Sequence, residues 1–221
     1  MKQGLIFDLD GTLVDSLRGI AASLNHALAS SDLSAHSHGT VRGFIGNGSR
    51  ILIERAAPAD AGEALLQVVE QAFKTHYDRT WPEGTIAYEG IVCMLETLQS
   101  RGYPLAVLSN KPHPFTGTIV AGVFPSIRFA CVLGQRAGIP HKPDPAGALE
   151  IATALHLRPD DCTVIGDSTM DLETARNAGM RAIAVTWGFH DRERLVAAGA
   201  EFIADDPAGL LAMLGGPDQE I

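Results

Sequence analysis

The sequence predicts an α/β protein with a doubly wound parallel sheet, and three observations support this prediction. A short apolar run near the start, residues 4–7, ends in two aspartates, as a buried strand at a ligand site does. From residue 82 onward, strand-like and helix-like segments alternate along the chain. Between them, residues 15–81 carry only helical patterns. We therefore expect an α/β core from residues 1–14 and 82–221, with a small all-helical domain, residues 15–81, inserted after the first strand.

The first strand is expected at residues 4–7, directly before Asp8, Asp10, Gly11 and Thr12. In an extended backbone, Asp8 and Asp10 would lie on the same side, where the strand ends. Two like charges there are costly unless a positive group sits between them. One interpretation is a carboxylate pair that holds a divalent cation, with one aspartate as a nucleophile. The alternative is a simple Asp-Gly turn.

The inserted block is expected to be helical, with helices at residues 17–28 and 62–81, where apolar side chains recur at helical spacing. Asp15 and Ser16 are expected to cap the first of these helices. Between these helices, residues 41–57 carry Gly43, Gly46 and Gly48, followed by an amphipathic stretch at residues 51–55. No clear strand pattern interrupts the block.

In the second part of the core, apolar runs of strand length alternate with helical segments. The expected strands are residues 104–108, 129–133, 162–165, 181–185 and 201–204. The expected helices are residues 91–100, 146–157, a segment that opens after Asp167, and 207–214. We expect residues 215–221 to fray.

Composition excludes several classes of function. Hydrophobic residues make up 46% of the 221 residues and charged residues 19%, which excludes global disorder. The formal charge of −9 and the lack of a Lys/Arg cluster argue against nucleic acid and anionic membranes as partners. No apolar stretch is long enough for a membrane span, and the start shows no signal-peptide pattern, so we expect a cytoplasmic protein. Cys93, Cys131 and Cys162 are expected to be reduced core thiols.

Polar side chains are expected at four strand-end loops, which converge at one edge of a parallel sheet. Three carboxylates suit Mg²⁺, which takes one or two carboxylates together with water and phosphate oxygens. A hydroxyl, backbone amides and a lysine suit a phosphate group. Each motif alone has a structural explanation, such as a helix cap, a solvated loop or an aspartate favoured by a helix dipole. The residues concerned are Asp8, Asp10, Ser109, Asn110, Lys142, Asp167 and Asp171.

Together and in this order, these motifs resemble the four motifs of the haloacid dehalogenase superfamily across nearly the whole chain. Four further segments resemble its phosphoglycolate phosphatase branch. They are Ile45-Gly46-Asn47-Gly48, Ser109-Asn110-Lys111-Pro112, His141-Lys142-Pro143-Asp144-Pro145 and Val185-Thr186-Trp187-Gly188. In that superfamily, a helical insertion directly after the first motif acts as a cap. The resemblance therefore implies a Rossmann-like core and a cap domain at residues 15–81.

The resemblance also implies a role for each matched residue. Asp8 would be the nucleophile that forms an aspartyl-phosphate, and Asp10 the general acid and base. The Asp8 carboxylate, the Asp10 backbone carbonyl and Asp167 would bind Mg²⁺. Asp171 would orient a metal-bound water or Lys142. Ser109, the Asn110 amide and Lys142 would hold the phosphate, with Lys142 also offsetting the charge of Asp8.

The resemblance implies a magnesium-dependent phosphatase for a small phosphorylated metabolite, and we expect 2-phosphoglycolate. Related sugar-phosphate or nucleotide phosphatases, a pyrophosphatase and a phosphomutase remain alternatives. A receiver-like domain phosphorylated on Asp8 is a non-enzymatic alternative. Substrate specificity is expected in the glycine loop, Gly46, Asn47 and Gly48. Arg50 is either a partner for a substrate carboxylate or a surface arginine. The oligomeric state is expected to be monomer or homodimer.

Overall fold

The computed structural model describes residues 3–215, and the chain divides into two compact units. Unit 1 comprises Met1–Val14 and Ala87–Ile221, and unit 2 comprises Asp15–Ile86. The chain crosses between units at β2 (Val14–Asp15) and β3 (Ile86–Ala87), which form a two-stranded sheet. The sequence pattern placed the second crossing after residue 81, but in the structure it lies between Ile86 and Ala87. The reason is that a 3₁₀ turn, η1 (Trp81–Glu83), prolongs the helical unit.

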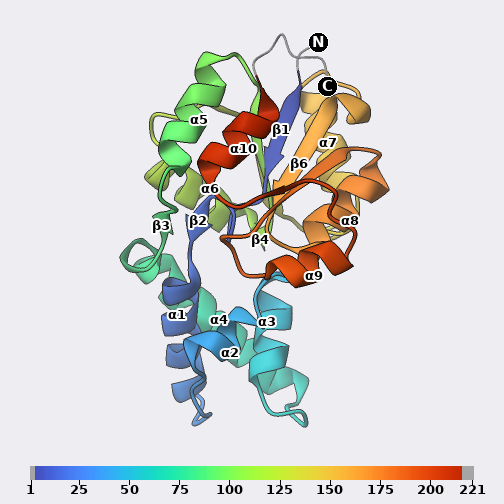
Figure 1. Cartoon of the computed structure of the whole chain (residues 1–221). Coiled ribbons are helices and arrows are strands. Elements are labelled where there is room, and N and C mark those ends of the chain that lie inside the picture. The colour runs from blue at the N-terminus through green and yellow to red at the C-terminus, as the bar shows by residue number, and fades with distance from the viewer. Residues whose placement is uncertain (1–2, 216–221) are drawn as a thin grey trace. The chain divides into compact units, whose positions relative to one another are not determined.

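Unit 1 is built on a six-stranded sheet in the order β5-β4-β1-β6-β7-β8 (Figure 1). All five strand pairs are parallel, which confirms the predicted fold class. In register, Ile6 of β1 lies between Ala106 of β4 and Val164 of β6. The strands are β1 (Gly4–Phe7), β4 (Leu105–Pro112), β5 (Phe129–Gln135), β6 (Cys162–Gly166), β7 (Arg181–Val185) and β8 (Ile203–Ala204).

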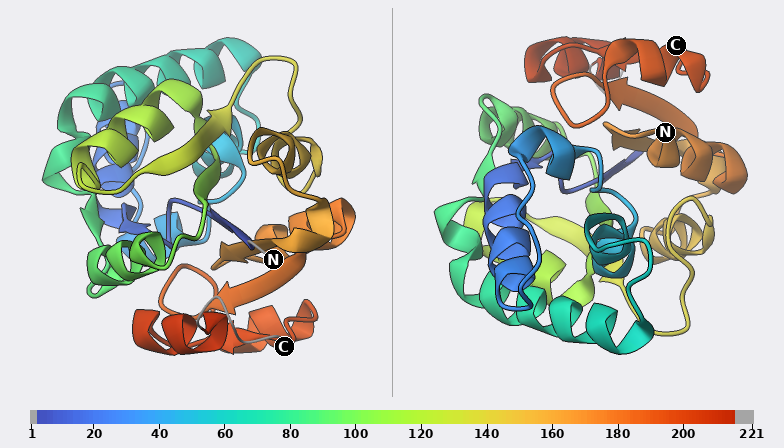
Figure 2. Two further views of the ribbon diagram at one scale, coloured as in Figure 1. Left: turned by 90° about the horizontal axis from the view of Figure 1, so that it is seen from above. Right: turned by 90° about the horizontal axis from the view of Figure 1, so that it is seen from below.

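The strand order reverses at β1, and this reversal places helices on both faces of the sheet. Crossovers between parallel strands are right-handed, so connections running in opposite directions along the sheet cover opposite faces. Helices α7 and α8 accordingly pack on one face, while α5 and α10 pack against each other on the other (Figures 1 and 2). The helices of this unit are α5 (Ile91–Ser100), α6 (His113–Val123), α7 (Ala146–Ala154), α8 (Thr169–Ala178), α9 (Arg192–Ala197) and α10 (Pro207–Leu214).

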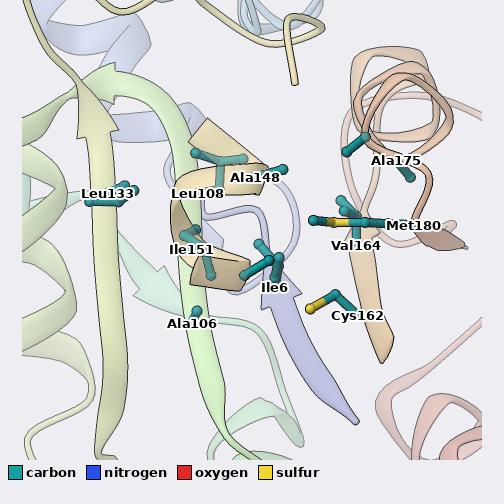
Figure 3. Packing of buried hydrophobic residues seen from close by; sticks show 12 residues of the cluster. Ile6, Ala106, Leu108, Leu133, Ala148, Ile151, Cys162, Val164, Ala175 and Met180 are labelled. Atoms are coloured by element: carbon teal, nitrogen blue, oxygen red, sulfur yellow. The ribbon is translucent and has the colours of Figure 1, made fainter. Parts of the chain in front are cut away.

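The core beneath α7 and α8 is made of small and branched apolar side chains (Figure 3). Ile6 lies at its centre and is completely buried. Strands buried on both faces need apolar side chains throughout, and β1 is buried along its whole length. This packing holds the carboxyl ends of β1, β4 and β6 side by side. Other members of the cluster are Ala106, Leu108, Leu133, Ala148, Ile151, Val164 and Ala175.

Unit 2 consists of α1 (Leu17–Ala29), α2 (His38–Arg42), α3 (Gly48–Ala56) and α4 (Glu63–Thr80). Helix α4 packs against both α1 and α3, and buries Val69, Phe73 and Tyr77. Asp15 caps α1 as predicted, since its Oδ1 accepts a hydrogen bond from the Leu17 N–H at 3.1 Å. Ser16 occupies the N-cap position without a side-chain capping bond.

Several boundaries differ from the sequence predictions. Helix α6 carries weak apolar periodicity and α9 is only six residues long, and neither was predicted. Residues 41–57 divide between α2 and α3, and the last strand begins at Ile203 instead of Glu201. Helix α7 ends at Ala154, before the predicted Leu157, because His156 adopts a positive φ of 56°. The Leu157 N–H then bonds back to the Ala152 carbonyl, which closes the helix. The tail predicted to fray from residue 215 lies, from 216 onward, outside the described residues.

The three cysteines are free, but only Cys162 is buried. Cys131 is half-buried and Cys93 is exposed, so the prediction that all three are core thiols is wrong. Cys93 faces solvent because α5 buries Ile91, Met94, Leu95 and Leu98, which puts position 93 on the opposite side of the helix. Among the helices described, none is both long enough and apolar enough to cross a membrane.

The core packing generates a stability prediction. Ile6→Ala should lower the free energy of unfolding by about 2–5 kcal/mol, because it removes buried methyl groups and leaves a cavity. Urea denaturation monitored by circular dichroism measures this change. Val196→Ala, at a 53% exposed position in α9, is the matched control and should change stability by no more than about 0.5 kcal/mol. Equal effects of the two substitutions would contradict the assignment of Ile6 to the core.

Candidate active site

The candidate site lies at the carboxyl ends of the parallel strands in unit 1. Asp8 follows β1 directly, Ser109 and Asn110 lie in the last part of β4, and Asp167 follows β6. Lys142 comes from the connection between β5 and α7, and Asp171 from the first turn of α8. Residues from five segments of the chain are thus brought together where open α/β sheets bind ligands.

Gly11 turns the first loop sharply after the aspartates. Its φ of 89° suits glycine, and its N–H bonds to the Val14 carbonyl at 2.9 Å. A Cβ at this position would overlap the Asp167 carboxylate. The turn therefore allows the first loop to pack directly against the loop after β6.

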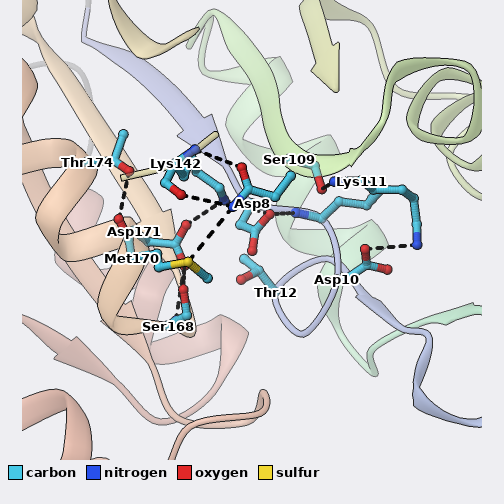
Figure 4. A network of polar contacts seen from close by, with 12 residues as sticks. Asp8, Asp10, Thr12, Ser109, Lys111, Lys142, Ser168, Met170, Asp171 and Thr174 are labelled. Carbon is cyan, nitrogen blue, oxygen red and sulfur yellow. Dashed lines mark hydrogen bonds and ion pairs between the residues drawn. The ribbon is translucent and has the colours of Figure 1, made fainter. Parts of the chain in front are cut away.

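Asp8 lies at the centre of a buried polar network (Figure 4). Its Oδ1 accepts hydrogen bonds from the Leu9 N–H at 2.7 Å and from the Lys142 Nζ at 2.9 Å. The same Nζ lies 2.7 Å from Oδ1 of Asp171. Lys142 thus bridges two carboxylates from opposite ends of the sequence, and its side chain is only 4% exposed.

Asp171 is fully engaged by its neighbours. While Oδ1 pairs with Lys142, Oδ2 accepts bonds from the Ser168 N–H at 3.0 Å and the Ser168 hydroxyl at 2.6 Å. These bonds also cap the start of α8. Asp171 is therefore held as a partner for Lys142.

Asn110 fixes the segment that carries Lys142. Its side-chain Oδ1 accepts from the Lys142 backbone N–H at 2.8 Å, and its Nδ2 donates to the Lys142 carbonyl at 3.1 Å. The neighbouring Ser109 hydroxyl accepts from the Lys111 N–H at 3.1 Å. The Asn110 side chain thus holds the backbone of Lys142 in place, a role that the sequence motifs did not predict.

Asp167 is oriented through both of its oxygens. Oδ1 accepts from the Thr12 hydroxyl at 2.9 Å, and Oδ2 accepts from the Phe189 N–H at 2.7 Å. A carboxylate has about four lone-pair positions, so one bond to each oxygen leaves capacity for a cation.

Asp10 faces a different lysine from Asp8. Its Oδ2 lies 3.0 Å from the Nζ of Lys111, and both side chains are largely buried. The two aspartates of the first loop therefore have separate positive partners, Lys142 and Lys111. The sequence motifs did not assign Lys111 to the site, although it follows Asn110 directly in the segment Ser109–Pro112. The signal that could have found it was the need for a second cation beside Asp10.

Burial and mutual repulsion act strongly on the acidic groups. Burial raises the pKa of Asp8 well above its ordinary value; Asp171 and Asp167 add to this rise, whereas Lys142 opposes it. Burial, and next the charge of Asp171, raise the pKa of Asp167 to about 7, although the Phe189 and Thr12 bonds oppose the rise. Burial alone would lower the pKa of Lys142, but Asp171 and Asp8 hold it above its ordinary value.

The donor set fits a hard divalent cation. Carboxylate oxygens of Asp8, Asp167 and Asp171 lie within 4.8 Å of one another. Oxygen ligands of this kind suit Mg²⁺ or Ca²⁺. Because the oxygens of Asp171 are taken by Lys142 and Ser168, Asp8 and Asp167 are the better placed of the three to bind an ion directly.

The predicted specificity residues all belong to unit 2. Gly46, Asn47 and Gly48 lie at the start of α3, where Arg55 donates to the Asn47 side chain at 2.8 Å. Arg50 pairs with Glu54 at 2.7 Å and with Glu63 at 2.5 Å. In this arrangement the Arg50 charge is met by two carboxylates of its own unit.

The family model for haloacid dehalogenase-like hydrolases matches residues 5–185. The chain belongs to this family. The matched region contains every core residue of the candidate site, from Asp8 to Asp171.

Similar proteins place this haloacid dehalogenase-like hydrolase in the phosphoglycolate phosphatase-like branch. Phosphoglycolate phosphatase of Pectobacterium atrosepticum is 32% identical over 216 residues, covering 96% of this chain and 92% of that protein. Phosphoglycolate phosphatase of Rhodospirillum rubrum is 33% identical over 224 residues, covering 98% and 92%. A crystal structure from Haemophilus somnus, described as a predicted phosphoglycolate phosphatase, aligns with a TM-score of 0.91 at 29% identity, covering 97% of this chain and 98% of that one.

The buried network around Lys142 generates a second stability prediction. Asp171→Asn should cost about 1–3 kcal/mol, because it removes one of the two carboxylates that bond to the buried Lys142 ammonium group, while Asp8 remains. The free energy of unfolding in urea measures this cost. Asp160→Asn is the matched control, since Asp160 pairs with Arg158 on the surface at 61% exposure, where about 0–1 kcal/mol is expected. A loss at Asp171 as small as that at Asp160 would mean that Lys142 does not depend on this partner.

Proposed function

We propose that this haloacid dehalogenase-like hydrolase is a magnesium-dependent phosphatase, and that 2-phosphoglycolate is its substrate. The observation that carries the proposal is the division of the two first-loop aspartates between two lysines. Asp8 joins the buried network with Lys142 and Asp171, while Asp10 faces Lys111. The names of the relatives at 32% and 33% identity support this reaction class.

Asp8 is assigned as the nucleophile. Its Oδ1 is held by the Leu9 N–H and by Lys142, so Oδ2 is the oxygen that we assign to attack on phosphorus. Attack forms an O–P bond to Asp8 and breaks the bond between phosphorus and the leaving-group oxygen, giving an aspartyl-phosphate. Lys142 would neutralise charge on Asp8 and on the phosphoryl group, with Asp171 fixing its position.

Asp10 is assigned as the general acid and base. It would protonate the leaving alkoxide in the first step and then accept a proton from the water that attacks the aspartyl-phosphate. The second step releases inorganic phosphate and restores Asp8. This role requires a carboxyl group that does not belong to the nucleophile's own network, which the pairing with Lys111 supports.

The phosphate oxygens are assigned to Ser109, the Asn110 backbone amide and Lys142. Ser109 and Lys142 are both buried beside Asp8, so they offer fixed donors instead of flexible surface groups. The Asp8 carboxylate, the Asp10 backbone carbonyl and the Asp167 carboxylate are the proposed magnesium ligands. When bound, the ion would offset negative charge on the phosphoryl group and on Asp8.

The test is a panel of phosphate esters with Mg²⁺ and the full-length protein, with inorganic phosphate as the readout. Phosphoglycolate should be hydrolysed with the highest kcat/KM, ahead of a sugar phosphate, a nucleoside monophosphate and pyrophosphate. Asp8→Asn should reduce kcat by on the order of 10⁴–10⁶-fold, because it removes the nucleophile. The circular dichroism spectrum of the variant checks that the fold is retained.

Three kinds of outcome would contradict the proposal. Activity retained in Asp8→Asn would exclude Asp8 as the nucleophile. A stable phosphoprotein formed from acetyl phosphate, without turnover of any ester, would favour the receiver-like alternative. Preferred turnover of another ester would make that ester the substrate in place of phosphoglycolate. Transfer of phosphate between two positions of one sugar would favour the phosphomutase alternative.

Unit 2 is proposed to act as the cap domain that selects the substrate, through Gly46, Asn47, Gly48 and Arg50. Arg50→Ala should raise the KM for phosphoglycolate by about tenfold, the loss of one charge-assisted hydrogen bond, and change the KM for ethyl phosphate much less. Arg79→Ala, at an exposed position of α4, is the matched control. Equal changes in KM for both esters would show that Arg50 does not bind the substrate carboxylate. Lys111 would then be the next candidate for this role, tested as Lys111→Met.

A further inference from the structure

The segment Trp187–His190, here named the post-β7 loop, reaches the site from a fifth strand end, that of β7. It follows β7, which pairs directly with β6. None of its side chains is among the groups assigned above to the nucleophile, the acid, the cation or the phosphate. Its contacts nevertheless fall on the loops that carry those groups.

The first contact is with Asp167. The Phe189 N–H donates to Oδ2 of Asp167 at 2.7 Å, and Asp167 is only 1% exposed. Gly188 lies directly against the same side chain, and a Cβ there would overlap both the Asp167 Cβ and the Gly11 carbonyl oxygen. The backbone of the loop therefore forms part of the wall that orients this carboxylate.

The second contact is with the loop after β1. The indole Nε1–H of Trp187 donates to the Thr12 carbonyl at 3.0 Å. Thr12 in turn donates its hydroxyl to Oδ1 of Asp167 at 2.9 Å. Both oxygens of Asp167 are thus fixed by this loop, one directly through Phe189 and the other through Thr12.

A third contact anchors the end of the loop. The Thr169 N–H, in the first turn of α8, donates to Nδ1 of His190 at 3.2 Å. The loop is therefore anchored at both ends. Trp187 bonds to the loop after β1, and His190 bonds to the first turn of α8, the helix that follows Asp167 in the sequence.

We propose that the post-β7 loop is a positioning element that sets the orientation of the Asp167 carboxylate for a divalent cation. The inference rests on the proposed function in one respect, namely that Asp167 binds the cation. Groups that orient a ligand from outside the coordination sphere typically contribute 10–100-fold to metal affinity. The loop acts through Asp167 and touches no reacting atom.

The test is Mn²⁺ binding to the full-length protein, measured without substrate by the electron paramagnetic resonance signal of free Mn²⁺. Gly188→Ala should raise the Kd for Mn²⁺ by about 100-fold, because its Cβ displaces Asp167. Trp187→Phe removes the Nε1–H donor but keeps an aromatic ring, and should raise the Kd by about tenfold. Asp167→Asn gives the benchmark for loss of the ligand.

Gly117→Ala is the matched glycine control, because nothing lies within 4 Å of a Cβ at this position in α6, and it should bind Mn²⁺ as the wild type does. Thermal unfolding without metal separates a general loss of stability from a loss of affinity. If Gly188→Ala fails to fold, Trp187→Phe decides alone. A folded variant of either kind that binds Mn²⁺ as tightly as the wild type overturns the proposal.

Failure of this inference can be told apart from failure of the proposed function. If the wild type binds Mn²⁺ and hydrolyses phosphoglycolate while the loop variants bind normally, only the positioning role is wrong. If the wild type binds Mn²⁺ but hydrolyses no ester, the proposed function fails and the comparison of affinities still decides the role of the loop. A wild type that binds no Mn²⁺ overturns both.

Discussion

The arrangement of the site depends on the compensation of buried negative charge. Asp8, Asp167 and Asp171 lie within a few ångströms of one another in a part of the protein where water is scarce. Without positive partners, such a group of carboxylates would not remain ionised. The ammonium group of Lys142 supplies the nearest compensation, and Asn110 and Asp171 keep it in place. The fold therefore brings a lysine from a distant loop to the end of the first strand.

Sheet topology explains how this compensation is achieved with few residues. Because the strand order reverses at β1, the loops after β4 and β6 flank the loop after β1. The chain can then bring Ser109, Asp8 and Asp167 together without long connections. The apolar packing around Ile6 fixes the spacing of these three strand ends, so the stability of the core and the geometry of the site have a common origin.

Sequence predicted the elements with strong periodicity and the residues with reactive side chains. The parallel sheet was predictable because each buried strand is a short apolar run, and Asp8, Lys142 and Asp167 were predictable because their motifs are ordered along it. Helix α6 was missed because its residues carry little amphipathic pattern. The Asp10–Lys111 pair was missed because spacing along a chain does not tell which lysine faces which carboxylate. The hydrogen bond from Phe189 was beyond prediction, since a backbone N–H has no sequence signature.

Three glycines lie directly against the acidic groups: Gly11 and Gly188 in two loops, and Gly166 at the end of β6. At each of them a side chain would occupy the space of Asp167 or Asp171. The geometry of the site thus depends also on three positions that carry no side chain. A side chain at any of these three positions would displace a carboxylate of the site, so the geometry depends on the absence of a Cβ as much as on the reactive groups themselves.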